Sequence, residues 1–281
     1  MGLGHRKKNK MRPTIPISAV LITRDAEEYL DQVLESLAIC DEIVILDSGS
    51  SDRTREIAAK HGARWHQHRF DGYGPQKRRA VALASHDWVL SIDADEILDR
   101  GAVMGIAGID WATADLLTCW RIRRRTFIGK REIHHGHWKT DRPIRIFNRL
   151  VTGITDVPVH ESVRPTTRVR NLPGSLMHYS YGDLSEIIRL DYHRLKAVRY
   201  RRDDRRAGGA LLALRAIWAG FHSFVIRAGF LEGGTGVVVA LAAAVNATMG
   251  LAMASEPLPV QRRLVRSNLR PIEGRALPKS A

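Results

Sequence analysis

Three carboxylates crowd into four residues directly after an apolar run, in the stretch DWVLSIDADEILDR. The run at 88–92 has the length of a buried strand, and Asp93, Asp95 and Glu96 follow it. Carboxylates this close repel one another, so a positive partner has to compensate them. Mg²⁺ or Mn²⁺ is such a partner, because hard cations bind carboxylate oxygens together with phosphate oxygens and water. The Asp-x-Asp spacing therefore predicts a metal-held nucleotide diphosphate; the alternative is a surface turn that caps a helix.

A second polar stretch, LDSGSSDRT at 46–54, also follows an apolar run. Asp47 stands at the predicted strand end, where it can accept a hydrogen bond from a base or a ribose. Asp52 is expected to cap the following helix. Lys77 and Arg78 begin a later helix, where cations oppose the helix dipole. They are expected near phosphates, and a solvated helix face is the alternative.

These residues need a sheet to bring them together. Strands are predicted at 17–22, 43–46, 65–68 and 88–92, and helices beginning at Asp25, Asp52 and Gln76. Asp25 is expected to cap its helix, with Glu28 as its capping-box partner. Apolar strands that alternate with helices predict an α/β fold with a mostly parallel sheet covered on both faces. Because such sheets bind ligands at the carboxyl ends of their strands, Asp47 and Asp93 are expected on one edge. Short strands and loops are predicted over 116–171, and helices from residue 184 onward.

The stretches ISAVLITRDAEEYLDQVLESLAICDEIVILDSGSSDRTREIAAKHGA and YGPQKRRAVALASHDWVLSIDADEIL resemble family-2 glycosyltransferases of the GT-A fold. The resemblance is greatest to the lipopolysaccharide core β-glucosyltransferase group. It continues through HHGHWKTDRPIRIFNR, VPVHESV and AGFLEGGTGVVVALAAAVNA. Three departures concern the donor and acceptor sites: Asp25-Ala26 replaces the usual Asn-Glu, Arg78 replaces a frequent Asn, and Lys139-Thr140 replaces an aromatic residue and Pro.

The resemblance implies roles on the donor side. Thr23 and Asp47 would line the base pocket, and Lys77 would lie near the nucleotide. Asp93 would lie near the ribose and the metal, and Asp95 would hold the metal, Mg²⁺ or Mn²⁺, against the diphosphate. UDP-glucose is the donor favoured by the resemblance.

A late histidine is a further candidate metal ligand. GT-A enzymes sometimes supply one, and His178 is in a suitable place, with a buried structural histidine as the alternative. The histidines at 134, 135 and 137 lack helical metal-ligand spacing, so polar packing is expected there rather than a metal site.

On the acceptor side the family inverts the anomeric centre in one displacement. That reaction needs a carboxylate base opposite the leaving nucleotide. Glu161 is the predicted base, Asp156 is its rival, and a simple ion pair with an arginine is the structural alternative for Glu161. The predicted acceptor-binding residues are Trp138, Asp141, Arg145 and His160.

The net charge and the apolar segments of the chain indicate which kinds of partner the protein binds. The net charge of +14 favours polyanions, namely nucleic acid, an anionic membrane or a phosphorylated substrate. No nucleic-acid motif is present, and the two distant cysteines predict neither a disulfide nor a zinc site. Arginines recur over 189–227 and an apolar segment follows at 237–254. We expect that segment to lie in a membrane interface, with a transmembrane span and a buried helix or oligomer contact as alternatives.

The sequence therefore predicts a division at 1–15, a disordered basic arm; 16–183, a catalytic domain; and 184–281, a helical basic and apolar region. Within the domain, 16–100 would bind the nucleotide sugar and 101–183 the acceptor. The predicted function is inverting glycosyl transfer, with glucose favoured, to an anionic lipid-linked glycan such as the lipopolysaccharide core. The enzyme would lie at the cytoplasmic face of the inner membrane. A nucleotidyltransferase and a noncatalytic basic protein that binds membrane or nucleic acid are the alternatives.

Overall fold

The computed structural model describes residues 14–139, 141–157, 161–188 and 190–256. Most of the predicted 1–15 arm and the predicted acceptor residue His160 lie outside these ranges. The chain order is β1 Ile15–Thr23, α1 Leu30–Ser36, β2 Cys40–Asp47, α2 Thr54–Lys60, β3 Arg64–Gln67, α3 Tyr73–Ala82, β4 Trp88–Ser91, β5 Glu96–Leu98, α4 Arg100–Ala107, β6 Thr118–Ile128, β7 Arg131–Ile133, β8 Ile144–Asn148 and β9 Arg168–Tyr181. The 3₁₀ turn η1 Leu184–Ile187, α5 Leu190–Arg202, α6 Gly209–Phe221, the π-helical turn η2 His222–Ile226, the 3₁₀ turn η3 Gly229–Glu232 and α7 Gly234–Ser255 follow.

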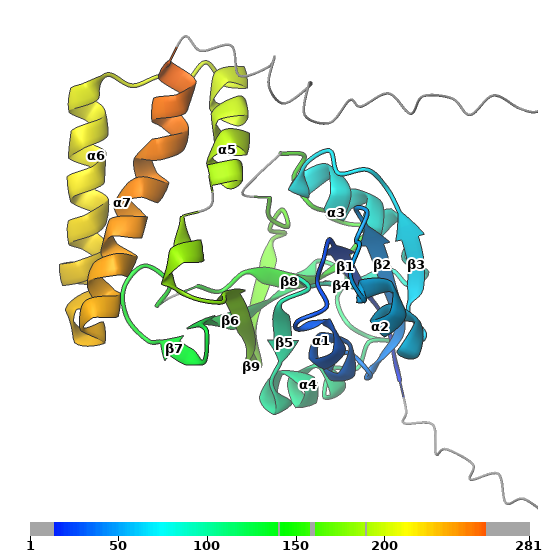
Figure 1. Cartoon of the computed structure of the whole chain (residues 1–281). Coiled ribbons are helices and arrows are strands. Elements are labelled where there is room, and N and C mark those ends of the chain that lie inside the picture. The colour runs from blue at the N-terminus through cyan, green and yellow to red at the C-terminus, as the bar shows by residue number, and fades with distance from the viewer. Residues whose placement is uncertain (1–13, 140, 158–160, 189, 257–281) are drawn as a thin grey trace, which may run out of the picture.

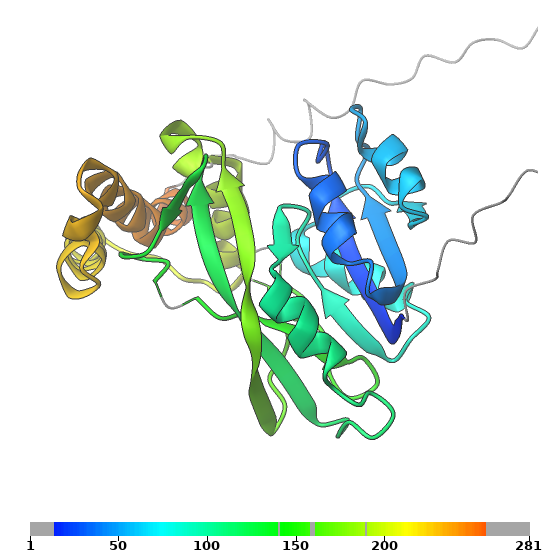
Figure 2. The same ribbon diagram turned by 90° about the horizontal axis from the view of Figure 1, so that it is seen from below.

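One mixed sheet is built from the strands between Ile15 and Tyr181 (Figures 1 and 2). Its order is β3-β2-β1-β4-β8-β6-β9-β5, with β7 paired to β6. The strands β3, β2, β1 and β4 are parallel, whereas β8 pairs antiparallel with both β4 and β6. The predicted α/β class is confirmed, and the predicted donor part 16–100 and acceptor part 101–183 share this sheet.

Helices cover both faces of the parallel strands because apolar side chains of β1 alternate between them. Ile17, Ala19 and Leu21 pack in a core with α1, α2 and α4, while Val20 packs on the other face with α3. The core with α1, α2 and α4 also contains three buried indoles, those of Trp88, Trp111 and Trp120, with ring centroids 5.2–5.3 Å apart. This core holds the carboxyl ends of β1, β2 and β4 at one edge.

The predicted helix starts differ from the structure, and α3 begins at Tyr73 rather than at Gln76. The first helix begins at Leu30, not at Asp25, because Asp25 adopts a φ of 46° and its carboxylate accepts a hydrogen bond from Ser51 N at 2.7 Å. In return, Asp52 accepts from Glu27 N at 2.9 Å, so the loops after β1 and β2 are joined. Asp52 also accepts from Thr54 N at 3.0 Å, but the N-cap of α2 is Arg53, so Asp52 lies one residue before the cap position.

The strands after residue 116 are longer than the sequence predicts. β6 has 11 residues and β9 has 14, and they pair in parallel. Polar and basic side chains interrupt both strands, which gives the sequence the pattern of short segments. The pairing of the two strands sustains their length, because each supplies backbone partners for the other.

The C-terminal region is helical, as predicted. The helices α5, α6 and α7 lie beside one another at one side of the sheet (Figure 1). In the described part of the chain, two helical segments are long and apolar enough to cross a membrane, 209–226 and 234–255. The sequence interpretation identified only the second of them.

Candidate functional site

The carboxyl ends of β1 and β2 are tied to each other by side chains. Thr23 and Asp47 are register partners at the last residue of each strand, and Thr23 Oγ1 donates to Asp47 Oδ1 at 2.9 Å. Asp47 Oδ2 accepts from Gly49 N at 2.7 Å and from Ser50 N at 2.8 Å, while the Ser50 hydroxyl donates to Oδ1. Gly49 has a φ of 96°, a conformation that favours glycine.

Asp47 is fully buried, and its own chain supplies four donors to its two oxygens. Burial alone raises its pKa, but the hydrogen bonds from Ser50, Gly49 and Thr23 outweigh burial and lower it. The carboxylate therefore fixes the shape of the loop after β2. Its contact with a base stays a prediction. For that contact, a donor of the base would have to replace one of the four donors from the chain.

A buried ion cluster lies just beyond β4. The Lys77 ammonium is 2.6 Å from Asp93 Oδ1, and Arg145 Nη2 donates to Asp93 Oδ2 at 2.8 Å and to Glu96 Oε1 at 2.5 Å. Asp93 N donates to Glu96 Oε2 at 3.1 Å. The pairing of β4 with β8 places Leu90 opposite Ile146, which brings Arg145 to this strand end. Burial alone raises the pKa of Asp93, but Lys77 and Arg145 hold it well below its usual range.

Glu161 joins the cluster from a distant part of the sequence. Its Oε1 is 2.7 Å from Lys77 Nζ, so one ammonium bridges Glu161 and Asp93. Gly74 makes this approach possible: Gly74 N donates to Val157 O at 3.1 Å, and a Cβ at Gly74 would lie 2.3 Å from that oxygen. The rival base, Asp156, forms an exposed pair with Arg78 at 2.8 Å.

The predicted acceptor residue Arg145 has a different place from the one expected. The residue is 8% exposed, and its guanidinium bonds to Asp93 and Glu96. Asp141 pairs with Arg124, whose Nε donates to Asp141 Oδ2 at 2.7 Å. Arg124 also contacts Glu96 Oε1 at 3.2 Å. The carboxylates of Asp93 and Glu96 thus occupy Arg145 in this structure, and its contact with an acceptor stays a prediction.

Asp95 and His178 face each other beside the cluster. His178 Nε2 is 3.4 Å from Asp95 Oδ2, because β5 and β9 pair with Glu96 opposite His178. Burial alone raises the pKa of Asp95, but the nearby imidazole lowers it. The Asp95 side chain is 34% exposed, whereas the His178 ring is mostly buried and also contacts the Ser180 hydroxyl at 2.7 Å. This donor pair fits Mg²⁺ or Mn²⁺ that takes its other ligands from phosphate and water.

The third predicted metal ligand is engaged elsewhere, since Asp93 bonds to Lys77 and Arg145. Within the described ranges no group of three or more His, Cys, Asp or Glu residues is arranged to hold a metal ion. The histidines near β7 follow the expected polar packing: Glu232 Oε1 accepts from His134 N at 2.9 Å and lies 3.0 Å from His135 Nδ1.

Trp138 also lies away from the ion cluster. It is partly buried against Ile128, Val239 and their neighbours, and its ring centroid is 5.6 Å from that of Tyr181. This packing connects the predicted acceptor segment to α7. A role in stacking on a sugar stays a prediction.

Sequence interpretation missed three residues that organise the site. Glu96 is fully buried among Arg145, Arg124 and the Asp93 amide, although its place in the Asp-Ala-Asp-Glu run was a visible signal. Arg124 is the middle one of three consecutive arginines, so the sequence does not show which of them contacts Glu96. Gln76 is fully buried, and its Nε2 donates to Ser48 Oγ and to His68 O, each at 3.1 Å.

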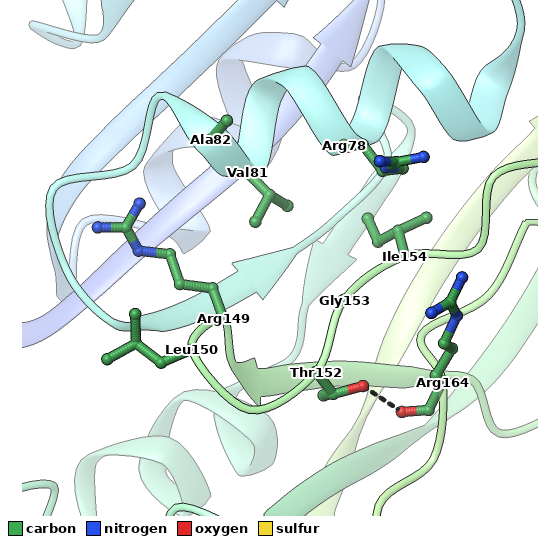
Figure 3. A pocket seen from close by; sticks show the side chains of 9 residues that line it. All are labelled: Arg78, Val81, Ala82, Arg149, Leu150, Thr152, Gly153, Ile154 and Arg164. Atoms are coloured by element: carbon green, nitrogen blue, oxygen red, sulfur yellow. Dashed lines mark hydrogen bonds between the residues drawn. The ribbon is translucent and has the colours of Figure 1, made fainter.

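A surface hollow lies on another side of α3, between this helix and the loop after β8 (Figure 3). Arg78, Arg149 and Arg164 line it, and Thr152 donates to Arg164 O at 2.8 Å. Asp93, Asp95 and Glu161 are not among its lining residues. The hollow is therefore separate from the candidate site.

Comparisons with known proteins bear on this arrangement. The model of the family described as glycosyl transferase family 2 matches residues 18–164, more than half of the chain. The lipopolysaccharide core biosynthesis glycosyltransferase LpsC of Rhizobium meliloti (strain 1021) is 34% identical over 177 residues, 60% of this chain and 65% of LpsC. An uncharacterized glycosyltransferase of Rickettsia bellii (strain RML369-C) is 24% identical over 238 residues, 80% of this chain and 81% of that protein. The chain thus covers slightly less than two thirds of LpsC.

Solved structures overlap only in part. Glucosyl-3-phosphoglycerate synthase from Mycobacterium tuberculosis, in complex with Mn²⁺, UDP and glucosyl-3-phosphoglycerate, is 27% identical with a TM-score of 0.32, over 41% of this chain and 44% of that chain. S. aureus TarS is 17% identical with a TM-score of 0.47, over 78% of this chain and 46% of that chain. The family model, which spans β1 to the segment after Glu161, confirms the family predicted from the sequence. The chain belongs to glycosyltransferase family 2.

Proposed function

We propose that the protein transfers a sugar, with inversion, from a nucleotide diphosphate sugar to a hydroxyl of an anionic lipid-linked glycan. UDP-glucose is the favoured donor and the lipopolysaccharide core the favoured acceptor. The observation that carries the proposal is the shared Lys77 ammonium, which lies within 2.7 Å of both Asp93 and Glu161. A candidate donor residue and a candidate base thus meet at the ligand-binding edge of the sheet.

The donor would bind along the carboxyl ends of β1, β2 and β4. Thr23 and the loop shaped by Asp47 would form the base pocket, and Asp93 would lie near the ribose. Lys77 would contact the diphosphate, because its buried ammonium lies 2.6 Å from Asp93 at this edge. An ammonium held in a buried site interacts strongly with phosphate charge.

The charges of the cluster favour a divalent cation. Lys77, Arg124 and Arg145 are linked to four carboxylates, those of Asp93, Glu96, Asp141 and Glu161. Asp95 adds another negative charge beside them. Asp95 and His178 would hold Mg²⁺ or Mn²⁺, which would neutralise charge on the departing diphosphate.

Glu161 would accept the proton of the acceptor hydroxyl. In the free enzyme its carboxylate is paired with Lys77 at 2.7 Å. A bound diphosphate brings negative charge to the same ammonium and competes with Glu161 for it. Donor binding would then release the base at the moment when an acceptor can use it, which disfavours wasteful attack by water.

The acceptor would approach from the β6–β7 side, where Asp141 and Trp138 lie. His160, outside the described residues, stays a proposed acceptor contact. The printed name of LpsC, a lipopolysaccharide core enzyme, supports an acceptor of this class. We place the protein at the cytoplasmic face of the inner membrane, peripherally bound. Membership of the family favours transfer over the two alternatives, a nucleotidyltransferase and a noncatalytic basic protein.

The decisive experiment separates donor binding from transfer. Thermal stability is measured with a panel of nucleotides and nucleotide sugars, with Mn²⁺ or with EDTA, for the wild type, Asp95→Asn and Glu161→Gln. We expect metal-dependent stabilisation by UDP and one UDP-sugar, since a bound ligand stabilises by mass action. Asp95→Asn should lose this stabilisation, whereas Glu161→Gln should keep it.

Transfer of radiolabelled sugar to a membrane fraction is then compared between variants. Glu161→Gln should slow transfer by about 10²–10⁴-fold, because the hydroxyl loses its base. Asp156→Asn is the matched control and should transfer at the wild-type rate. Unchanged transfer by Glu161→Gln would remove Glu161 as the base, and a folded protein that no nucleotide stabilises would contradict the donor assignment.

A further inference from the structure

The outer face of α6 carries a row of large apolar side chains that no other described element covers. They are Leu211, Leu214, Ile217, Trp218 and Phe221, together with Val225 in the following turn η2, and we call this set the α6 stripe. Their spacing of three or four residues places them on one helix face. Ile217 is 69% exposed and Trp218 is 62% exposed, and no residue of α6 is buried. A contiguous exposed apolar face of this kind marks an interaction site.

The other face of α6 lies on α7. A Cβ at Gly220 would be 3.7 Å from Ala240 O and 4.0 Å from the Ala244 Cβ, so small residues line this contact. Packing through small residues lets the two helices approach closely and leaves the α6 stripe pointing away from the molecule. Of the two apolar helical segments, 209–226 has 6% of its residues buried, whereas the most apolar 18 residues of 234–255 have 39% buried.

The sequence interpretation assigned the membrane contact to 237–254, but α7 is the more buried of the two apolar helices and packs against α5 and α6. Besides α6, it contacts the basic helix α5, from which Lys196 Nζ donates to Asn246 O at 2.6 Å. Arg201 Nη2 donates to Met253 O at 2.5 Å. If α7 crossed the hydrocarbon, α5 and its cations would have to enter with it, which is costly. The segment 237–254 therefore serves as the support of α6.

The charge next to the stripe indicates what covers it. Residues 199–206, at the end of α5 and just before α6, contain five arginines and two aspartates. Arg202, Arg205 and Arg206 are exposed. From residue 207 to 226 the chain has Arg215 but no acidic residue. Basic residues beside an apolar face with a tryptophan match the headgroups and acyl boundary of an anionic bilayer.

We propose that the α6 stripe lies in the interface of an anionic lipid bilayer, with α6 parallel to the membrane plane. This deepens the proposed function, since it names the surface that would bring the enzyme to a lipid-linked acceptor. The binding itself does not depend on catalysis. A second copy of the chain on the stripe, or a span across the bilayer, are the competing arrangements that the test must separate.

The test uses the full chain in flotation with phosphatidylcholine vesicles, with and without a minority of phosphatidylglycerol. We expect the wild type to float with the anionic vesicles, less so at high salt because salt screens the arginines. Leu214→Glu/Ile217→Glu should bind at least about tenfold more weakly, since charges cannot enter the acyl boundary. Met104→Glu, on α4, is the matched control because Met104 is 62% exposed, and it should bind like the wild type.

A second measurement locates the contact. Brominated lipids should quench the fluorescence of the wild type, and Trp218→Phe should remove most of this quenching while it still floats. Equal flotation of the Leu214→Glu/Ile217→Glu variant would overturn the proposal. The proposal would also be overturned if the wild type did not bind vesicles but formed a dimer, and if the Leu214→Glu/Ile217→Glu variant were a monomer. Resistance to extraction at high salt and alkaline pH would overturn the in-plane arrangement in favour of a span.

Nucleotide-dependent thermal stability is recorded on the same samples. If the Leu214→Glu/Ile217→Glu variant loses vesicle binding but keeps its stabilisation by nucleotide, the α6 assignment is confirmed. If the Met104→Glu control shows the same loss, the assignment is contradicted. Vesicle binding through the stripe without any nucleotide response would leave the membrane surface in place and contradict the proposed function alone.

Discussion

The sheet edge and the α6 stripe reverse the usual distribution of side chains in opposite ways. At the sheet edge, Lys77, Arg145 and Glu96 are buried charges. On α6, Leu214 and Ile217 are exposed apolar side chains. Charged residues are rarely buried without partners, and large exposed apolar faces are rare on monomeric proteins.

The two regions differ in whether their unusual side chains have partners within the protein. The buried charges have partners within the protein. Asp95 and Lys77 lie at the edge where a charged ligand would bind. The α6 stripe has no partner among the described residues. The difference teaches that the sheet edge is organised before its ligand arrives, whereas the stripe would be completed only by a second surface.

The largest expected effect tests the buried half of the comparison. Lys77→Met keeps the side-chain volume but removes the cation shared by Asp93 and Glu161. We expect a loss of about 3–5 kcal/mol in the free energy of unfolding at neutral pH, because two carboxylates lose a buried partner. Urea denaturation measures it. Arg78→Met, the next residue of α3 with a half-exposed partner, should change stability by less than about 1 kcal/mol.

A smaller effect separates a structural carboxylate from those of the sheet edge. Glu42 accepts hydrogen bonds from Ser85 N and Ser85 Oγ, each at 2.7 Å, and also contacts Ser18 and Arg64. Burial alone raises its pKa, but these groups outweigh burial and lower it from 4.5 to about 2. Because the folded-state pKa is depressed, the stabilisation is complete above about pH 4.5 and is lost as the pH falls toward 2.

Glu42→Gln should therefore cost about 2–3 kcal/mol at pH 7 and almost nothing near pH 2. Unfolding measured across this pH range checks the prediction. The exposed variant Glu56→Gln should follow the wild-type pH profile. A Glu42→Gln loss that is the same at both pH values would show that packing, not charge, is responsible.

The smallest expected effect tests the exposed half. Leu214→Glu should change the free energy of unfolding by no more than about 0.5 kcal/mol in lipid-free solution, because Leu214 is exposed in the folded chain. For contrast, Ile106→Ala in the fully buried core should cost about 2–5 kcal/mol. Thermal or urea unfolding of both variants measures the difference. A large loss in Leu214→Glu would mean that the stripe has a partner within the protein.

Much of the donor half could be predicted from the sequence. Apolar runs of strand length predict Asp47 and Asp93 at the carboxyl ends of parallel strands, and the structure has them there. Helix starts were less predictable. Asp25 has the sequence features of a cap, but its carboxylate binds the loop after β2. Tertiary hydrogen bonds overrode a local preference at that position.

The acceptor half was harder to predict because its contacts are remote in sequence. Arg145 has the chemistry to bind an acceptor carboxylate or phosphate, yet two carboxylates of this chain occupy it. Likewise, Arg124 cannot be distinguished from Arg123 and Arg125 by residue type. Only the strand pairing decides which of them turns toward Glu96.

The sequence by itself determined the α/β class, the family, the carboxylates at the strand ends and the apolar character of the C-terminal region. These follow from local patterns, because strand and helix periodicity and strand-end position are properties of neighbouring residues. Tertiary structure alone decided that Lys77, Arg145 and Arg124 compensate the carboxylates, that Glu161 reaches Lys77, and that α7 is more buried than α6. Each depends on which distant segments pack together, and hydrophobic burial and ion pairing settle that only when the whole chain has folded.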